Sequence, residues 1–149
     1  MRTDEFVMRG QTASDSEETL NFSGYKPGYA YKMVEFMLYP STNIGSANVE
    51  LMGSVTASKT AEDPQNPDYN NEGLIATAYF VDNASNAVPV SEVSVVNHTF
   101  LITQNLILKV KDSGGANTAV NWQCKFMPVK MSGPEEAVTN YRQFLISDD

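Results

Sequence analysis

The clearest pattern in the chain is a strict alternation of apolar and polar side chains near its C-terminus. The apolar members are Val120, Trp122, Cys124 and Phe126, and the polar members are Asn121, Gln123 and Lys125. Successive side chains of a β-strand point to opposite faces, so a period of two predicts a strand. One face of that strand is buried and the other meets water, which indicates a sheet covered on one side.

Other segments show strand patterns of the same kind. The predicted long strands are 29–39, 48–57, 73–82, 99–111 and 118–131, with short candidates at 6–8, 20–22 and 92–97. The glycine-rich segment 112–117 joins the last two as a hairpin. We expect residues 1–18 to be an N-terminal arm or mobile segment and 19–131 to be the folded domain. These strands predict an all-β fold, a β-sandwich of jelly-roll or Greek-key type, with a barrel as second choice.

One short C-terminal α-helix completes the predicted architecture. Ser132 and Glu135 have the spacing of a capping box, with Pro134 in the first turn, so we expect a helix over 134–146. Its apolar side chains recur at helical spacing: Val138, Tyr141, Phe144 and Leu145. A helix this short is not stable alone. Residues 132–149 are therefore expected to pack on the sandwich or on a neighbouring subunit.

The composition narrows the classes of partner. Among 149 residues, 18 Asp and Glu against 10 Lys and Arg give a formal net charge of −8. Phosphate backbones and anionic lipid surfaces repel such a chain, so we expect neither a nucleic-acid nor a membrane partner. No run approaches the roughly 18 apolar residues that span a bilayer. The first residues also lack the apolar core of a secretory signal.

Candidate catalytic groups are few. The chain has one cysteine, Cys124, and one histidine, His98, which excludes an internal disulfide framework and any site that needs two histidines. His98 lies where two predicted strands meet, and no nucleophile signature accompanies it. Cys124 alternates in phase with buried side chains and is expected to be an unreactive core thiol. We predict no enzymatic activity, no catalytic residue and no cofactor.

The long polar loop 59–72 is the best candidate for a metal site. Asp68, Asn70 and Glu72 alternate within it, and Ca²⁺ prefers oxygen ligands of this kind. The string lacks the glycine and the distant bidentate glutamate of an EF-hand loop. Asp, Asn and Pro also favour loops for conformational reasons alone. We therefore predict no metal site, and leave open whether this loop binds calcium.

The strand 29–39 carries an unusual second face rich in tyrosine and methionine, with Glu35 as its only charge. Three explanations remain open: a central strand of the sandwich, a contact with a partner chain, or a platform for carbohydrate. Together with the helix, this face supplies the candidate interface residues Tyr29, Tyr31, Met33, Met37, Tyr39, Tyr141 and Phe144.

The pattern of the chain as a whole resembles the small structural proteins of tailed-phage virions, most closely capsid cement or decoration proteins, and the resemblance covers most of the chain. The resemblance rests on the strand 106–110, the turn 112–117, the strand 120–123 running into 126–130, and the Ser132-capped helix. It implies a non-enzymatic subunit on the capsid surface, made in the host cytoplasm. Its partners would be the major capsid protein or other virion subunits, as a homo-oligomer or bound to the lattice. No site residues carry over from this class.

An alternative function is a carbohydrate- or receptor-binding β-sandwich module. This function needs exposed aromatic side chains. The inward phase of Trp122 counts against it.

Overall fold

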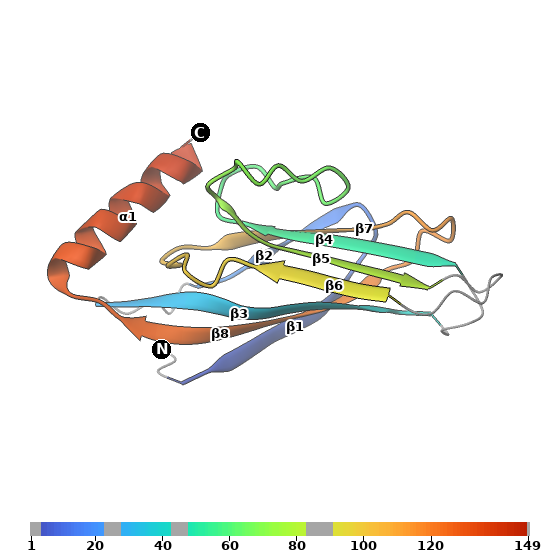
Figure 1. The fold of residues 1–149 in the computed structure, drawn as a ribbon, viewed down its shortest axis with the longest axis horizontal. Helices are drawn as coiled ribbons and strands as arrows, with labels where there is room; N and C mark the ends of the chain where they lie inside the picture. The colour runs from blue at the N-terminus through green and yellow to red at the C-terminus, as the bar shows by residue number, and fades with distance from the viewer. Residues whose placement is uncertain (1–3, 23–27, 43–47, 83–90, 149) are drawn as a thin grey trace.

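The computed structural model describes residues 4–22, 28–42, 48–82 and 91–148. Within the C-terminal helix it describes the side chains of residues 133–135, 137–139 and 141–142. The described residues form two antiparallel sheets and one helix (Figure 1). The elements are β1 (Phe6–Thr12), β2 (Ser16–Leu20), β3 (Tyr29–Pro40), β4 (Val49–Thr56), β5 (Leu74–Asp82), β6 (Ser91–Val96), β7 (Leu106–Asp112), β8 (Val120–Lys130) and α1 (Gly133–Asp148). The predicted all-β sandwich with one C-terminal helix is confirmed.

The strand order is of the jelly-roll type. One sheet has the order β1-β8-β3 and the other β2-β7-β4-β5-β6. The strands pair in nested fashion, from the ends of the chain inward: β1 with β8, β2 with β7, and the consecutive strands β4 and β5 with each other. The remaining strands, β3 and β6, lie at the borders of the two sheets, where Ser94 Oγ donates a hydrogen bond of 2.7 Å to Phe36 O. Three of the four nested strand pairs of an eight-stranded jelly roll are therefore present, whereas β6 pairs with β5 and not with β3.

The core lies between the two sheets. Inward side chains of β7 and β8 supply much of it, and the alternation in β8 has the predicted phase: Leu106, Leu108, Val110, Val120, Trp122, Cys124 and Phe126 are all buried. Trp122 keeps its one polar atom satisfied, because Nε1 donates to Thr12 Oγ1 at 2.9 Å. Near the start of β3, Phe6, Phe22, Tyr31 and Phe126 pack with ring centroids 5.1 to 6.3 Å apart.

A bulge in β3 changes which of its side chains reach the core. The pairing with β8 shifts between Met33 and Glu35, so one residue of β3 has no partner. Before the bulge, Tyr31 and Met33 point inward and are buried. After it, Phe36 and Leu38 are the buried side chains. The inward phase therefore switches from odd to even positions, which a uniform period of two cannot represent.

The expectation of an arm or mobile segment at 1–18 is wrong for residues 6–12 and 16–18. These residues belong to β1 and β2, which form an edge of each sheet. Only Phe6 and Thr12 of β1 and Leu20 of β2 are buried, so little apolar alternation marks these strands. Backbone pairing with β8 and β7 defines them instead. The predicted short strand at 20–22 ends at Leu20, and β7 begins at Leu106 rather than Thr99.

The sheets approach closely at Gly53, which the sequence places at an inward position of β4. A Cβ atom added there would lie 2.9 Å from Phe36 Cζ and 3.2 Å from Leu38 Cδ2.

We expect Gly53→Ala to lower the free energy of unfolding by about 1–3 kcal/mol. Thermal unfolding measures the change. Gly133→Ala is the control, because no atom lies within 4 Å of its added Cβ, and its Tm should stay close to that of the wild type. An unchanged Tm for Gly53→Ala would show that the sheets have room there.

Candidate functional site

The connection between β4 and β5, residues 57–73, is a folded loop fixed to the outer face of β4. Ser54 Oγ donates to Glu62 O at 2.6 Å, and Glu62 N donates to Thr56 Oγ1 at 3.1 Å. Both hydroxyl residues are buried, although they point away from the core. The loop therefore forms a fixed cover over one end of the five-stranded sheet.

The carboxylates of this loop organise its own backbone. Glu62 accepts hydrogen bonds of 2.7 Å from Asp68 N and from Asn71 Nδ2. Asp63 Oδ1 accepts from Gln65 N at 3.0 Å, and Asp68 Oδ1 accepts from Asn70 N at 2.9 Å. Turns of this kind explain the Asp- and Asn-rich composition without a metal. Among the described residues, no three His, Cys, Asp or Glu side chains lie close enough together to hold a metal ion.

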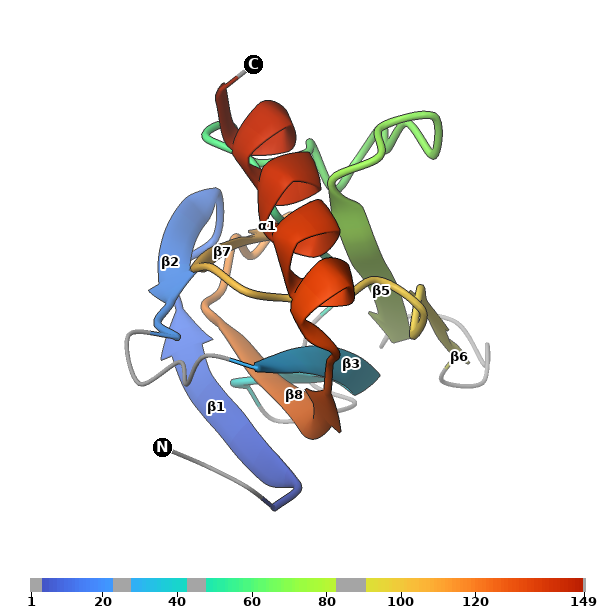
Figure 2. The same cartoon turned by 90° about the vertical axis from the view of Figure 1, so that its left-hand side faces the viewer.

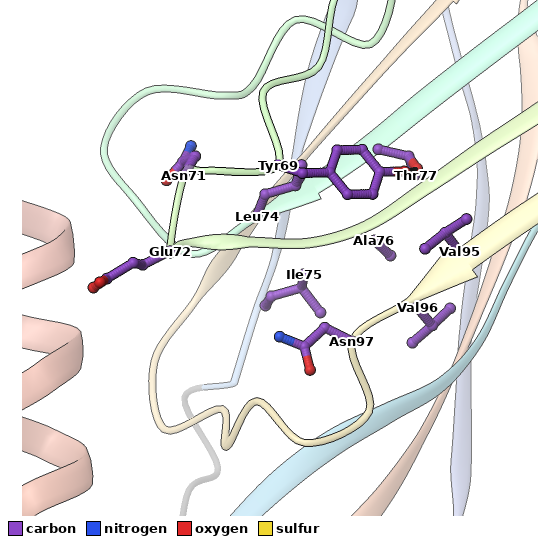
Figure 3. Close-up of a pocket in the computed structure, with 10 residues that line it drawn as sticks. All are labelled: Tyr69, Asn71, Glu72, Leu74, Ile75, Ala76, Thr77, Val95, Val96 and Asn97. Carbon is purple, nitrogen blue, oxygen red and sulfur yellow. Dashed lines mark hydrogen bonds between the residues drawn. The ribbon is translucent and has the colours of Figure 1, made fainter.

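A pocket of about 220 Å³ lies between this loop and the neighbouring ends of β5 and β6 (Figure 3). Ile75, Ala76 and Val96 supply apolar lining. Tyr69 stands at the mouth, 59% exposed, and its hydroxyl shares a hydrogen bond of 2.5 Å with Thr77 Oγ1. The volume is below the usual 300–1,000 Å³ of small-molecule sites. It suits one large side chain from a protein partner.

Helix α1 begins with the predicted capping box. Glu135 N donates to Ser132 Oγ at 3.3 Å, and Ser132 N donates to Glu135 Oε1 at 3.4 Å. Beyond this cap, Val138 is 53% and Tyr141 is 63% exposed. Figures 1 and 2 show α1 leaving β8 and standing off the sandwich, at the end where the 57–73 loop lies. Of the two predicted positions for this helix, on the sandwich or on a neighbouring subunit, the first does not hold for Val138 and Tyr141, because both are exposed.

The predicted interface residues fall into separate groups. Tyr31 and Met33 are buried in the core, so they are not available to a partner, and Tyr29 is half-buried. Met37 and Tyr39 are exposed on the outer face of β3, towards the strand end away from α1. Tyr141 is exposed on α1, and the side chain of Phe144 lies outside the described residues.

The structure places the two candidate reactive residues in different environments. His98 is exposed in the turn after β6, where the Asn97 side chain accepts hydrogen bonds from Thr99. Cys124 is a free thiol in the core, and its burial raises its pKa, so the reactive thiolate is disfavoured.

The chain matches no protein-family model and no curated protein sequence. In the described part of the chain, no helix is long and apolar enough to cross a bilayer. The features that remain as candidates for function are surfaces: the exposed face of α1, the Tyr69 pocket, and the outer face of the three-stranded sheet. Sequence reasoning found the first of these through its helical spacing. It missed the Tyr69 pocket, for which the length of the polar loop was the one available signal.

Proposed function

We propose that this chain is a non-enzymatic structural subunit of a tailed-phage virion, a capsid cement or decoration protein that binds the head lattice and stabilises it. The observation that carries the proposal is the free-standing helix α1. Its 16 residues extend from β8 while Val138 and Tyr141 face solvent. Isolated helices of this length are marginal in water, so docking on a neighbouring subunit is the expected source of its stability.

The Tyr69 pocket supports the same function. It lies at the end of the sandwich from which α1 extends (Figures 1 and 3). Binding energy in protein interfaces concentrates in a few large side chains that fill desolvated pockets. The molecule therefore offers, at one end, a protruding helix with two exposed apolar side chains and a receiving pocket. Both are features of an attachment surface.

The fold and the charge are compatible with this role. Capsid domains use jelly rolls, and so do lectins, so the fold alone does not choose between them. The net charge of −8 favours a place on the outside of the shell, away from packaged DNA. A subunit that binds only the assembled lattice stabilises it by mass action.

The test uses virions of the phage whose genome encodes the chain. Immunogold labelling with antibody against the purified protein should mark the heads. Heads stripped of the protein should release DNA at a lower temperature, and adding back the wild-type chain should restore that temperature. A Val138→Ser, Tyr141→Ser double variant should fail to bind, because it removes the apolar contacts of α1.

Val93→Ser is the matched control, since Val93 is an equally exposed apolar residue on β6. This variant should bind stripped heads like the wild type. Gold label confined to tails, or absent from virions, would contradict the proposal. Full binding by the double variant would show that α1 is not the attachment element.

A further inference from the structure

The outer face of the three-stranded sheet carries a groove of about 570 Å³ that differs in chemistry from the Tyr69 pocket. Its lining includes Arg9 of β1, Met37 and Tyr39 of β3, Glu92 of β6, and Asn121 and Gln123 of β8. The volume falls within the usual range of small-molecule sites and is more than twice that of the Tyr69 pocket.

The strand register arranges these side chains in two rows across the sheet. Arg9, Gln123 and Met37 are cross-strand neighbours in one row. Gln11, Asn121 and Tyr39 form the next. Directly opposed side chains in an antiparallel sheet lie about 4.5–5.5 Å apart at Cβ. Each row therefore places a planar polar group directly beside an apolar or aromatic one.

Hydrogen bonds fix one of the two amides that line the groove, that of Asn121. Asn121 Oδ1 accepts from Gln11 Nε2 at 2.9 Å, and Asn121 Nδ2 donates to Pro40 O at 3.2 Å. Within the described part of the chain, Arg9 and Gln123 form no side-chain hydrogen bond or ion pair. The groove thus presents a guanidinium, with donors only, and an amide, with donors and an acceptor.

Tyr39 gives the groove an aromatic wall. Its side chain is 57% exposed, and its ring lies 6.0 Å from the ring of Phe80, at an interplanar angle of 47°. That contact with a buried residue of the other sheet limits the motion of the tyrosine ring. An exposed ring with a supported orientation offers a flat apolar surface for stacking.

We propose that this groove binds a neutral saccharide. Sugar hydroxyls both donate and accept hydrogen bonds, which matches the amide and guanidinium groups, and the C–H face of a pyranose ring packs on an aromatic ring. One positive charge, on Arg9, and one negative charge, on Glu92, line the groove, so its formal charge balances and favours an uncharged ligand. Tyr39, rather than the buried Trp122, supplies the stacking surface.

The groove lies away from the proposed attachment end. Its β8 residues are at the start of that strand, whereas α1 follows the other end of β8. A subunit attached through α1 would leave this groove open to solvent. Saccharide binding therefore stands independently of the capsid role, and the α1 double variant should retain it.

The full-length protein is screened against immobilised neutral oligosaccharides of glucose, galactose, mannose and N-acetylhexosamines, with sialylated and uronic-acid glycans for comparison. Hits are titrated by the fluorescence of Trp122, the single tryptophan, which also lines the groove. We expect binding in the millimolar range or tighter, with charged glycans no better than neutral ones. Tyr39→Ala should weaken binding about tenfold or more.

Two further variants make the result specific to the groove. Gln123→Ala should also weaken binding, because it removes from the central strand β8 an amide that lines the groove. Tyr69→Ala should leave binding unchanged, since Tyr69 is an equally exposed tyrosine outside the groove. Thermal unfolding of each variant confirms that it is folded.

Three outcomes would overturn the proposal. The first is the absence of binding to every neutral glycan at millimolar concentration. The second is binding that survives both Tyr39→Ala and Gln123→Ala. The third is a fall in the sedimentation mass of the protein caused by Tyr39→Ala without any glycan binding, which would make the groove a protein interface.

Discussion

Replacing Asp112 by alanine is expected to lower the free energy of unfolding by about 3 kcal/mol. Asp112 is buried at the end of β7. One carboxylate oxygen accepts from Glu50 N at 3.1 Å and from Gly114 N at 2.9 Å. The other accepts from Thr118 N at 2.9 Å and from Thr118 Oγ1 at 2.6 Å. Its removal leaves several part-buried donors without this acceptor.

The same carboxylate should make stability depend on pH. Burial by itself would raise the pKa of Asp112, but the hydrogen bonds from Thr118, Gly114 and Glu50 outweigh it and lower that pKa below its usual 3.8. Because the pKa of Asp112 is lower in the folded state than in the unfolded chain, its carboxylate stabilises the protein at pH values above the pKa that Asp112 has in the unfolded chain. This contribution is lost as the pH falls through the lower pKa of the folded state.

Urea unfolding of the wild type and of Asp112→Asn, measured from pH 7 down to pH 3, tests this prediction. The stability difference between the two proteins should be constant at neutral pH and shrink below about pH 4. Asp4→Asn is a suitable control, because Asp4 is exposed and precedes β1, and its stability difference from the wild type should stay small at every pH. A difference that does not change with pH would show that the charge of Asp112 does not contribute.

Gly114→Ala is expected to be comparably destabilising, by about 3 kcal/mol. An added Cβ would lie 2.5 Å from Asn48 O and 2.8 Å from both Glu50 N and Val49 Cα. These are backbone atoms at the start of β4, so they cannot move without disturbing the pairing of β4 with its neighbours. For a domain of this size, Tm should fall by about 6–12 °C.

A comparison of Gly114→Ala with Gly115→Ala, its neighbour in the turn, distinguishes the effect of steric overlap from that of backbone strain. Gly115 has a φ of 98°, but nothing lies within 4 Å of its added Cβ. Gly115→Ala should therefore cost only the penalty of the left-handed conformation, about 1–2 kcal/mol. Thermal unfolding compares the two variants. Equal losses would show that strain in the turn, rather than its contact with β4, determines the effect.

Several elements were predictable because their signals are local. The alternation from Val120 to Phe126 predicted β8 and its buried face, and both are observed. The Ser132–Glu135 spacing predicted the start of α1. A strand period and a helix cap depend on residues that are neighbours in sequence, so a sequence pattern records them directly.

The candidate surfaces were harder to predict. The groove draws Arg9, Tyr39, Glu92 and Gln123 from four different strands. Their proximity depends on which strands pair, and no local pattern records that pairing. The bulge in β3 also determines which of its odd-numbered side chains are exposed. Tyr31 and Met33, before the bulge, are buried in the core, whereas Met37 and Tyr39, after it, are exposed.

The sequence by itself determined the all-β class, the long strands and the capped helix, because backbone geometry and side-chain alternation act over a few residues. Only the tertiary structure decided the jelly-roll order, the inclusion of β1 and β2 in the sheets, and the free-standing position of α1. Those features depend on contacts between distant segments. Many alternative pairings would satisfy the same local pattern, and packing of the complete core selects among them.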